Sequence, residues 1–268
     1  MIFASDLDRT LIYSNRFLDE RHVDLPVRSV EKYKGSDISF MTERAIALLQ
    51  QLAERMIFIP VTTRTVEQYQ RISLFQKEVR PEYAITCNGG VILKNGEVDR
   101  QWQDYVLTKM NESSTSLATV KRKIEETADA SWLESIRVVS PFFVYLLVKP
   151  ELVSLEVLKE YEEWASDHGW AFSFQGRKVY FIPKPVNKWD AVQYLSENAG
   201  KNTVFSAGDS YLDVCLVEQA SFGLIPRHGE AAKNNLHLPL TQTEGILAAE
   251  EIIETMLAKV AESNIASR

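Results

Sequence analysis

The sequence predicts an α/β protein in which an inserted α+β domain interrupts a doubly wound parallel-sheet core. Short apolar segments alternate with amphipathic helical segments from the start of the chain to about residue 86. This alternation stops, hairpin patterns typical of antiparallel sheets follow, and the alternation returns from Lys188. We therefore expect a core of residues 1–88 and 184–268, and an inserted domain of residues 89–183.

The first part of the core is predicted to contain three buried strands and two helices. The strands are short apolar runs bounded by polar residues, at 1–5, 56–61 and 83–86. One helix begins near Thr42, because Ala45, Leu48, Leu49 and Leu52 recur on one helical face. A second helix is predicted over 66–75, and a hairpin is possible around Lys34-Gly35.

The inserted domain has the pattern of an antiparallel sheet with two helices. A hairpin with an Asn95-Gly96 turn is predicted over 91–98, because Asn-Gly favours this type of turn. The remaining predicted elements are a polar helix at about 111–129, a strand at 142–148, an amphipathic helix at 150–168, and strands at 172–174 and 179–182.

The alternating pattern of the second core part predicts a helix at 188–198, a strand at 203–207, a helix at 212–219, a strand at 221–225 and a closing helix at 245–260. In a doubly wound sheet, the carboxyl ends of the parallel strands lie along one edge, where ligands bind. Residues that follow these strands are therefore the first candidates for a functional site.

Composition narrows the function classes. The 268 residues are 45% hydrophobic and carry a net charge of −7, which argues against a protein that binds nucleic acid through the phosphate backbone. No apolar run reaches membrane-spanning length. The two cysteines, Cys87 and Cys215, lack metal or redox spacing and favour buried thiols in a reducing compartment. We expect a cytoplasmic protein, and the sequence carries no signal for its oligomeric state.

Several polar residues follow the predicted parallel strands: Asp6 and Asp8 after the first, Thr62 after the second, and Asp209 near the next-to-last. The sheet geometry predicts that these side chains converge on one pocket. Lys188 begins a helix that could reach the same edge. Asp209 and Asp213 are spaced i, i+4 and so share a helical face. Thr10 could fasten the loop after Asp8 through its hydroxyl.

Each of these residues also has a purely structural explanation. Asp209 could cap a helix, Thr62 could be a strand-end hydroxyl, and Lys188 could be a solvated residue in a first helical turn. Taken singly, each structural role is the more common one. Their occurrence together, in this order and on matching elements, favours a functional site.

The pentapeptide Asp6-Leu7-Asp8-Arg9-Thr10, with Thr62, Lys188 and the 208–213 segment Gly-Asp-Ser-Tyr-Leu-Asp, resembles the haloacid dehalogenase (HAD) superfamily of phosphatases. The 85–90 and 182–188 segments resemble those that bracket the large C2-type cap of its Cof-type and sucrose-phosphatase-like branch. The resemblance implies a Rossmann-like core with a cap. It also implies a Mg²⁺-dependent phosphatase that hydrolyses a small phosphate monoester, such as a sugar phosphate.

The resemblance also implies a role for each motif residue. Asp6 would attack phosphorus and form an aspartyl-phosphate. Asp6, the main-chain carbonyl of Asp8, and Asp209 would hold Mg²⁺, with Asp213 as a further ligand or an anchor. Asp8 would act as general acid and then as general base. Lys188 would neutralise charge, and Thr62 would donate a hydrogen bond to a phosphoryl oxygen.

The candidates for substrate contact are Arg9, Thr63, Arg64, Asn88, Arg177 and Lys178. Arg9 and Thr63 both stand where many members of the superfamily carry glycine. The backbone amide of Arg9 can still hold phosphate oxygens, while its side chain adds charge and bulk without an assigned purpose. The basic residues have an alternative explanation as exposed residues on turns.

Other functions remain open. A signalling receiver domain also places acidic residues, a threonine and a lysine around Mg²⁺, but it would lack a large insertion between the threonine and the lysine. A phosphomutase would return the phosphoryl group to its substrate, and a catalytically silent relative would only bind a phosphorylated metabolite. In each enzymatic case the expected partner is a small phosphorylated metabolite, with no nucleic acid and no membrane.

Overall fold

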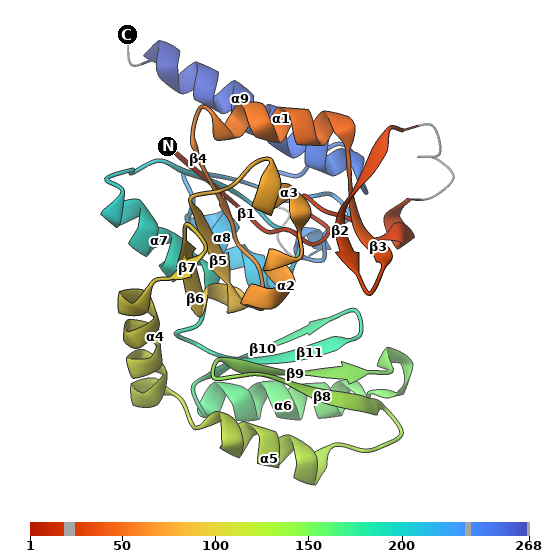
Figure 1. The fold of residues 1–268 in the computed structure, drawn as a ribbon. Helices are drawn as coiled ribbons and strands as arrows, with labels where there is room; N and C mark the ends of the chain where they lie inside the picture. The colour runs from red at the N-terminus through yellow and green to blue at the C-terminus, as the bar shows by residue number, and fades with distance from the viewer. Residues whose placement is uncertain (19–24, 234–236, 267–268) are drawn as a thin grey trace. The chain divides into compact units, whose positions relative to one another are not determined.

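The computed structural model describes residues 1–18, 25–233 and 237–266 (Figure 1). The chain divides into two compact units. Unit 1 comprises Met1–Asp99 and Lys188–Arg268, and unit 2 comprises Arg100–Asn187. The assignment of a catalytic role to the first and a cap role to the second remains a prediction.

A four-stranded parallel sheet forms the centre of unit 1. Its strands are β1 (Ile2–Ser5), β4 (Ile57–Pro60), β12 (Val204–Ala207) and β13 (Phe222–Leu224). Their order is β13-β12-β1-β4, and every neighbouring pair is parallel. Because β1 is flanked on both sides, its carboxyl end opens between the ends of β4 and β12. The predicted parallel α/β core is confirmed.

A second sheet in unit 1 corrects one predicted boundary. It has the order β5-β6-β7, with bounds Tyr83–Thr86, Val91–Lys94 and Glu97–Val98. The hairpin predicted at 91–98 forms, and its Asn95-Gly96 turn has the positive φ angles that Asn-Gly favours. It pairs with β5, however, and β5 joins β4 through a parallel bridge between Val61 and Ile85. The hairpin therefore belongs to unit 1 rather than to the inserted segment.

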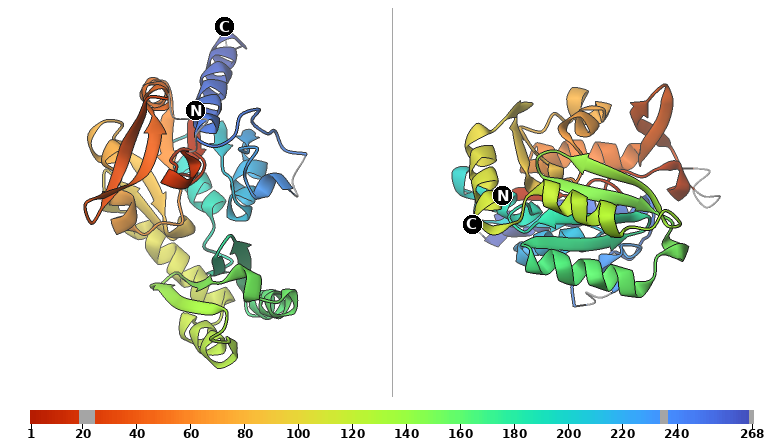
Figure 2. Two further views of the ribbon diagram at one scale, coloured as in Figure 1. Left: turned by 90° about the vertical axis from the view of Figure 1, so that its right-hand side faces the viewer. Right: turned by 90° about the horizontal axis from the view of Figure 1, so that it is seen from below.

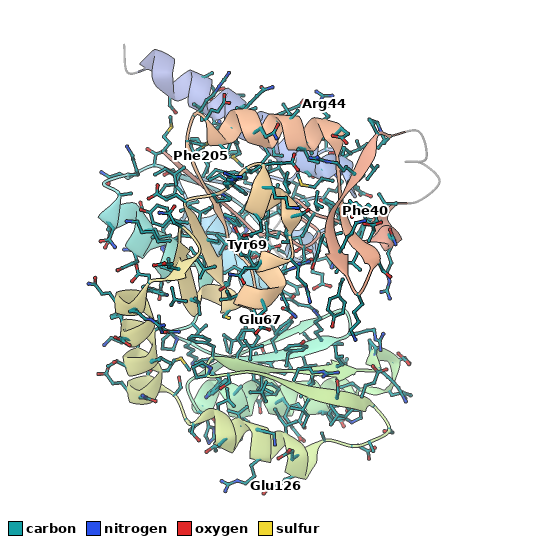
Figure 3. The ribbon with its side chains drawn as sticks, in the orientation of Figure 1. Phe40, Arg44, Glu67, Tyr69, Glu126 and Phe205 are labelled. Carbon is teal, nitrogen blue, oxygen red and sulfur yellow. The ribbon has the colours of Figure 1, made fainter. Side chains whose placement is uncertain are left out.

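The helices of unit 1 lie beside its sheets, and several of them contact one another. They are α1 (Glu43–Ala53), α2 (Val66–Gln70), α3 (Ser73–Lys77), α7 (Lys188–Asn198), α8 (Val214–Gln219) and α9 (Leu247–Ala266). The α1 helix lies beside α9, where Thr42 donates a hydrogen bond to Glu250, whereas α7 contacts α8 (Figure 1). Phe205 of β12 is buried in the interior, and Arg44 of α1 is exposed (Figure 3).

A hairpin precedes α1, as predicted around Lys34-Gly35. Its strands are β2 (Val27–Tyr33) and β3 (Ser36–Thr42). Thr42 ends β3 and caps α1, because its hydroxyl accepts a hydrogen bond from the Ala45 amide at 3.0 Å. The hairpin also brings the buried Glu31 into unit 1.

Unit 2 is an antiparallel sheet with helices, as predicted. The sheet order is β10-β11-β9-β8, with bounds Trp170–Gln175, Lys178–Pro183, Phe143–Val148 and Leu133–Val139. The helices are α4 (Arg100–Ser113), α5 (Leu117–Thr127) and α6 (Leu155–Asp167). Both α5 and α6 cover one face of the sheet (Figure 1 and Figure 2). Trp170, Phe181, Val144 and Ile124 form part of the core between them.

Two predicted elements differ from the structure. The single helix predicted at about 111–129 corresponds mainly to α5, which the Ser116 hydroxyl caps, and α4, which ends at Ser113, was not predicted. The helix predicted over 66–75 is divided between α2 and α3, because the chain turns at Arg71 to bury Ile72. Strand β8 was not predicted.

Both cysteines are free thiols, with Cys87 buried and Cys215 half-buried. None of the helices in the described ranges is both long enough and apolar enough to cross a membrane.

Candidate active site

Asp6 lies directly after β1, at the centre of the parallel sheet. Its amide donates a hydrogen bond to the Ala207 carbonyl at the end of β12, so its backbone is held between strand ends. Its carboxylate is 94% buried, accepts a hydrogen bond from Lys188 Nζ at 2.6 Å, and accepts another from the Thr10 hydroxyl at 3.3 Å. The predicted loop-fastening role of Thr10 is thus present in the structure.

Lys188 begins α7 and is 1% exposed. This burial rules out the purely structural explanation, in which Lys188 would be a solvated residue of a first helical turn. Its ammonium also donates to Asp213 Oδ1 at 2.5 Å. Burial alone would lower the pKa of Lys188, but Asp213 and Asp6 beside it raise that pKa above its ordinary value. Lys188 is therefore held as a buried cation between two carboxylates.

Asp213 is fully buried and is fixed from two directions. One of its oxygens contacts Lys188, and the other accepts hydrogen bonds from the Ser210 amide at 2.9 Å and the Ser210 hydroxyl at 2.7 Å. Gly208 allows this approach, because a Cβ atom there would lie 2.2 Å from the Asp213 Cβ. The segment 208–213 thus holds a carboxylate against the end of β12.

Asp209 completes a cluster of three buried carboxylates. One ligand atom from each of Asp6, Asp209 and Asp213 lies within 4.8 Å of the others. Asp209 Oδ2 is buried without a hydrogen bond, although Arg9 Nε lies 3.4 Å from it. Burial raises the pKa of Asp209 well above its usual range, and Asp6 and Asp213 raise it further.

Asp6 responds to the same environment. Burial raises its pKa to about 7, Lys188 opposes this increase, and Asp213 adds to it. The cluster holds three carboxylates beside the Lys188 ammonium, so a further cation would favour the ionised form of Asp6.

The cluster fits a Mg²⁺ ion. Its donors are all carboxylate oxygens, which this hard cation prefers. The unbonded Oδ2 of Asp209 is an acceptor that a cation would satisfy. Asp6, Asp209 and Asp213 are three of the four residues predicted to hold the ion. The fourth, Asp8, was predicted to contribute its main-chain carbonyl, and this ligand set remains a prediction.

Asp8 lies apart from the buried cluster. Its side chain is 51% exposed and accepts two hydrogen bonds from Arg64, at 2.7 and 2.8 Å. Arg64 in turn donates to the buried Glu31 at 2.8 Å, and Arg71 and Ser39 also contact Glu31. Burial alone would lower the pKa of Arg64, but Asp8 and Glu31 raise it. Arg64 is therefore paired with Asp8 and Glu31 in this structure. It is not an unpaired cation that a substrate could bind directly.

The β4 end carries the predicted threonines. Thr62 is fully buried, its amide donates to the Ile85 carbonyl, and its hydroxyl accepts a hydrogen bond from the Arg64 amide at 3.2 Å. Thr63 is half-buried. Asn88 is buried with a φ of 59°, and its amide donates to the Thr62 carbonyl. Hydrogen bonds thus tie Asn88 to the end of β4.

Arg177 and Lys178 lie in unit 2, at the turn between β10 and β11. Arg177 pairs with Glu134 at 2.5 Å, and the Lys178 ammonium lies 5.6 Å from the centre of the Tyr145 ring. Their predicted contact with substrate remains a prediction.

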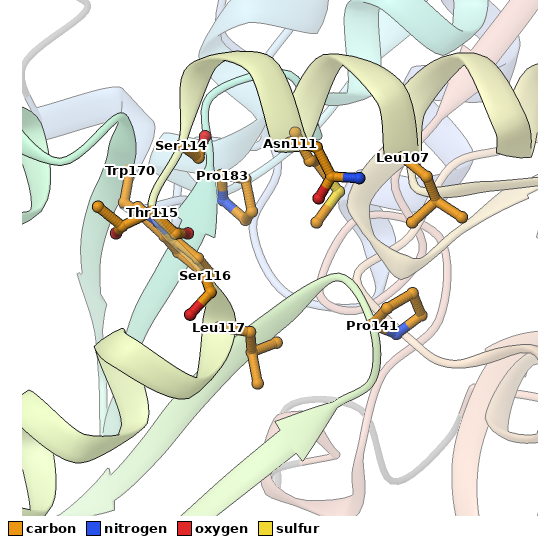
Figure 4. Close-up of a pocket in the computed structure, with 10 residues that line it drawn as sticks. Leu107, Asn111, Ser114, Thr115, Ser116, Leu117, Pro141, Trp170 and Pro183 are labelled. Atoms are coloured by element: carbon orange, nitrogen blue, oxygen red, sulfur yellow. The ribbon is translucent and has the colours of Figure 1, made fainter.

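A cavity of about 290 Å³ lies within unit 2, where α4 ends and α5 begins, beside Pro141, Trp170 and Pro183 (Figure 4). None of its lining residues carries an ionisable side chain. The charged cluster of unit 1 is therefore the better candidate for phosphoryl chemistry.

The structure adds residues to the site that the sequence analysis did not select. Ser210 holds Asp213, Glu31 holds Arg64, and His228 donates a hydrogen bond to the Arg9 carbonyl at 2.9 Å. Ser210 and Asp213 have the spacing of a capping box, which is a sequence signal for this contact. Glu31 and His228 have no such signal, because folding alone brings them near the site.

Comparison with known proteins gives the family of this chain. A model of the sucrose-6F-phosphate phosphohydrolase family matches residues 1–257. The chain belongs to this family. It is therefore a phosphatase of the HAD superfamily, in the sucrose-phosphatase-like branch that the motifs predicted. The sucrose-6F-phosphate phosphohydrolase family match spans both units, from β1 to α9.

Solved structures with the same fold include the sucrose-phosphatase of Synechocystis sp. PCC6803 in complex with sucrose and phosphate. It has a TM-score of 0.68 and 19% identity, with 95% of this chain and 97% of that chain covered. The HAD subclass IIB sugar phosphatase BT4131 has a TM-score of 0.63 and 14% identity, with coverage of 97% and 99%. SMU.1108c from Streptococcus mutans UA159 has a TM-score of 0.62 and 15% identity, with coverage of 96% and 98%.

A search of curated protein sequences found no match.

Proposed function

We propose that this protein hydrolyses a sugar phosphate or a similar small phosphate monoester through an aspartyl-phosphate on Asp6. The observation that carries the proposal is the buried Asp6 carboxylate, paired with Lys188 inside a cluster of three aspartates. One protein with this fold was solved in complex with sucrose and phosphate, and another is a sugar phosphatase, which supports a sugar phosphate.

The nucleophile and its charge partners have separate tasks. Asp6 attacks phosphorus, and the phosphorus–oxygen bond to the leaving alcohol breaks. Lys188 offsets the charge of Asp6 and of the phosphoryl oxygens, while Asp213 and Ser210 keep Lys188 in place. When bound between Asp6, Asp209 and Asp213, Mg²⁺ would neutralise further negative charge on the phosphoryl group. Thr62 would donate its hydroxyl hydrogen to a phosphoryl oxygen.

Asp8 would carry protons in both half-reactions. It would give a proton to the leaving oxygen and then take one from the water that hydrolyses the aspartyl-phosphate. Asp8 now accepts two hydrogen bonds from Arg64, one on each carboxylate oxygen, and each oxygen keeps a second lone pair that can carry the proton. The candidates for holding the rest of the substrate remain Arg9, Thr63, Arg64, Asn88, Arg177 and Lys178.

The first experiment measures phosphate release from a panel of phosphorylated sugars, polyols and nucleotides by wild-type protein and Asp6→Asn. The variant should lose at least about 10³-fold in turnover, because an amide cannot act as the nucleophile. Asp104→Asn, at an exposed carboxylate of α4, is the matched control and should keep its activity.

Substantial phosphate release by folded Asp6→Asn would contradict the nucleophile assignment. Transfer of phosphate within a sugar, without release of free phosphate, would support the phosphomutase alternative. A stable phosphoprotein without turnover would support a receiver-like role.

The two free cysteines support a reducing compartment, and we infer from them a cytoplasmic location.

A further inference from the structure

Arg9 has an unusual backbone conformation that is fixed from both sides. Its φ is 65°, a left-handed value that glycine adopts more easily. Its amide donates to the Ile12 carbonyl at 2.8 Å, and its carbonyl accepts a hydrogen bond from His228 Nε2 at 2.9 Å. His228 Nδ1 accepts from the Gly245 amide, so the ring hydrogen must be on Nε2. The amide and the carbonyl of Arg9 are therefore both hydrogen-bonded, which fixes the position from which its side chain extends.

The Arg9 guanidinium lies among acceptors at long distances. Its Nε is 3.4 Å from Asp209 Oδ2, its Nη1 is 3.5 Å from Glu230 Oε1, and its Nη2 donates to the His228 carbonyl at 3.4 Å. Neither Arg9 Nε nor Asp209 Oδ2 has a hydrogen bond, so their contact is an ion pair without one. The side chain of Arg9 is 35% exposed. Arg9 is therefore a loosely held cation beside the acidic cluster.

The same oxygen of Asp209 is buried without a hydrogen bond, so it is available as a ligand for a divalent cation. Mg²⁺ binds oxygen at about 2.1 Å, so an ion on Asp209 Oδ2 would lie within about 5.5 Å of Arg9 Nε. At such a separation in a buried site, two positive groups repel each other strongly. The ion and the guanidinium thus compete for one carboxylate.

Glu230 gives the guanidinium a second acceptor. It is already 3.5 Å from Arg9 Nη1, its side chain is 17% exposed, and its Oε2 is buried without a hydrogen bond. A guanidinium displaced from Asp209 can therefore form new hydrogen bonds with Glu230 and retain its charge pairing.

We propose that Arg9 is a built-in counter-ion that weakens divalent-cation binding at Asp209, and that Glu230 takes over its guanidinium when a cation binds. The inference rests on the proposed metal role of Asp6, Asp209 and Asp213. It assigns Arg9 to the control of metal occupancy, in addition to its candidate role in substrate contact.

The test is a titration of the metal-free protein with MgCl₂ by isothermal calorimetry, without substrate. Arg9→Gly should bind Mg²⁺ at least about tenfold more tightly than wild type, because a coupling of this size is typical of two sites that compete. Arg9→Lys keeps the charge and should remain weak. Arg9→Asn, which also tolerates a positive φ, should resemble Arg9→Gly and serves as the second charge-removing variant.

Arg80→Gly is the matched control. Arg80 is an exposed arginine of unit 1, its φ is 45°, and its Nε donates only to the Lys77 carbonyl among the hydrogen bonds of the described residues. The control removes the same charge and relieves a similar backbone, so its Mg²⁺ affinity should equal that of wild type.

Equal or weaker Mg²⁺ binding by both Arg9→Gly and Arg9→Asn would overturn the inference, and so would equal tightening by Arg9→Lys. If wild type binds Mg²⁺ and these variants do not bind it more tightly, the metal role stands and only the inference fails. If neither wild type nor any variant binds Mg²⁺, the metal role fails as well.

Discussion

At the scale of single residues, the position of Asp213 depends on the absence of a side chain at Gly208. A Cβ atom at residue 208 would lie 2.2 Å from the Asp213 Cβ and 2.6 Å from its Cγ. Asp213 cannot retreat freely, because it is fully buried and bonded to both Lys188 and Ser210. A methyl group at residue 208 must therefore displace a member of the charged cluster.

We predict that Gly208→Ala reduces turnover strongly and lowers the free energy of unfolding by about 1–3 kcal/mol, the usual cost of overpacking. Gly35→Ala is the control, because its Cβ would meet open space and only its φ of 82° costs energy. The control should lose stability while keeping its turnover per folded molecule. Urea denaturation and phosphate release check both; normal turnover in Gly208→Ala would mean that Asp213 can move without consequence.

Residue types and spacing predicted which charged residues would lie together, while the functional roles of those residues remain predictions. Asp6, Lys188, Asp209 and Asp213 were selected because they follow strand ends or begin a helix, and the structure brings them together. Spacing along the chain could not predict that Arg64 would hold Asp8, because that contact depends on Glu31 from a distant hairpin. Contacts between side chains that are far apart in sequence require the folded backbone.

At the scale of secondary-structure elements, the buried parallel strands were the easiest to predict. They are short apolar runs, and each lies within a residue or two of its predicted position. By contrast, β8 escaped prediction because its residues are mostly exposed or half-buried and lack a clear alternation. The helix α4 also escaped, since only Trp102 and Val106 of its residues are buried. Apolar patterning reports burial, so weakly buried elements leave little signal.

The buried carboxylates of Asp6 and Asp209, which follow β1 and β12, predict that metal binding depends on pH. Burial raises the pKa of Asp6 to about 7, so a proton occupies this carboxylate as the pH falls through 7. Burial also raises the pKa of Asp209 well above its ordinary value. A cation must displace those protons, so Mg²⁺ should bind more weakly at pH 6 than at pH 8. Each displaced proton weakens binding by up to about tenfold per pH unit below the pKa.

The measurement is the increase in melting temperature on adding MgCl₂ at pH 6 and pH 8, with NaCl at equal ionic strength as the control. A larger increase at pH 8 is expected. An equal increase at both pH values would show that the cation does not compete with protons for these carboxylates.

At the scale of the whole molecule, unit 2 has a hydrophobic core made of its own residues. In unit 2, Ile124 of α5 is fully buried in the cluster with Trp170 and Phe181. The acidic cluster, in contrast, draws all its members from unit 1. Stability of unit 2 and metal binding by unit 1 should therefore respond to different substitutions.

We predict that Ile124→Ala lowers the free energy of unfolding by about 2–5 kcal/mol, because it leaves a cavity in the core of unit 2. Mg²⁺ affinity of the folded protein should not change. Lys121→Ala, at a half-buried position of the same helix whose side chain is 43% exposed, should cost at most about 0.5 kcal/mol. Denaturant unfolding and calorimetric titration test the pair, and a weakened Mg²⁺ affinity in folded Ile124→Ala would show that the two units are coupled.

Unit 2 begins at Arg100, directly after Asp99, and ends immediately before Lys188. The three aspartates of the acidic cluster and Lys188 all belong to unit 1, in segments on either side of this insertion. Residues 100–187 can therefore change in length and sequence during evolution without altering the three aspartates of the cluster or Lys188. Among descendants of one ancestor, we expect the inserted segment to diverge faster than the strand ends that carry the charges.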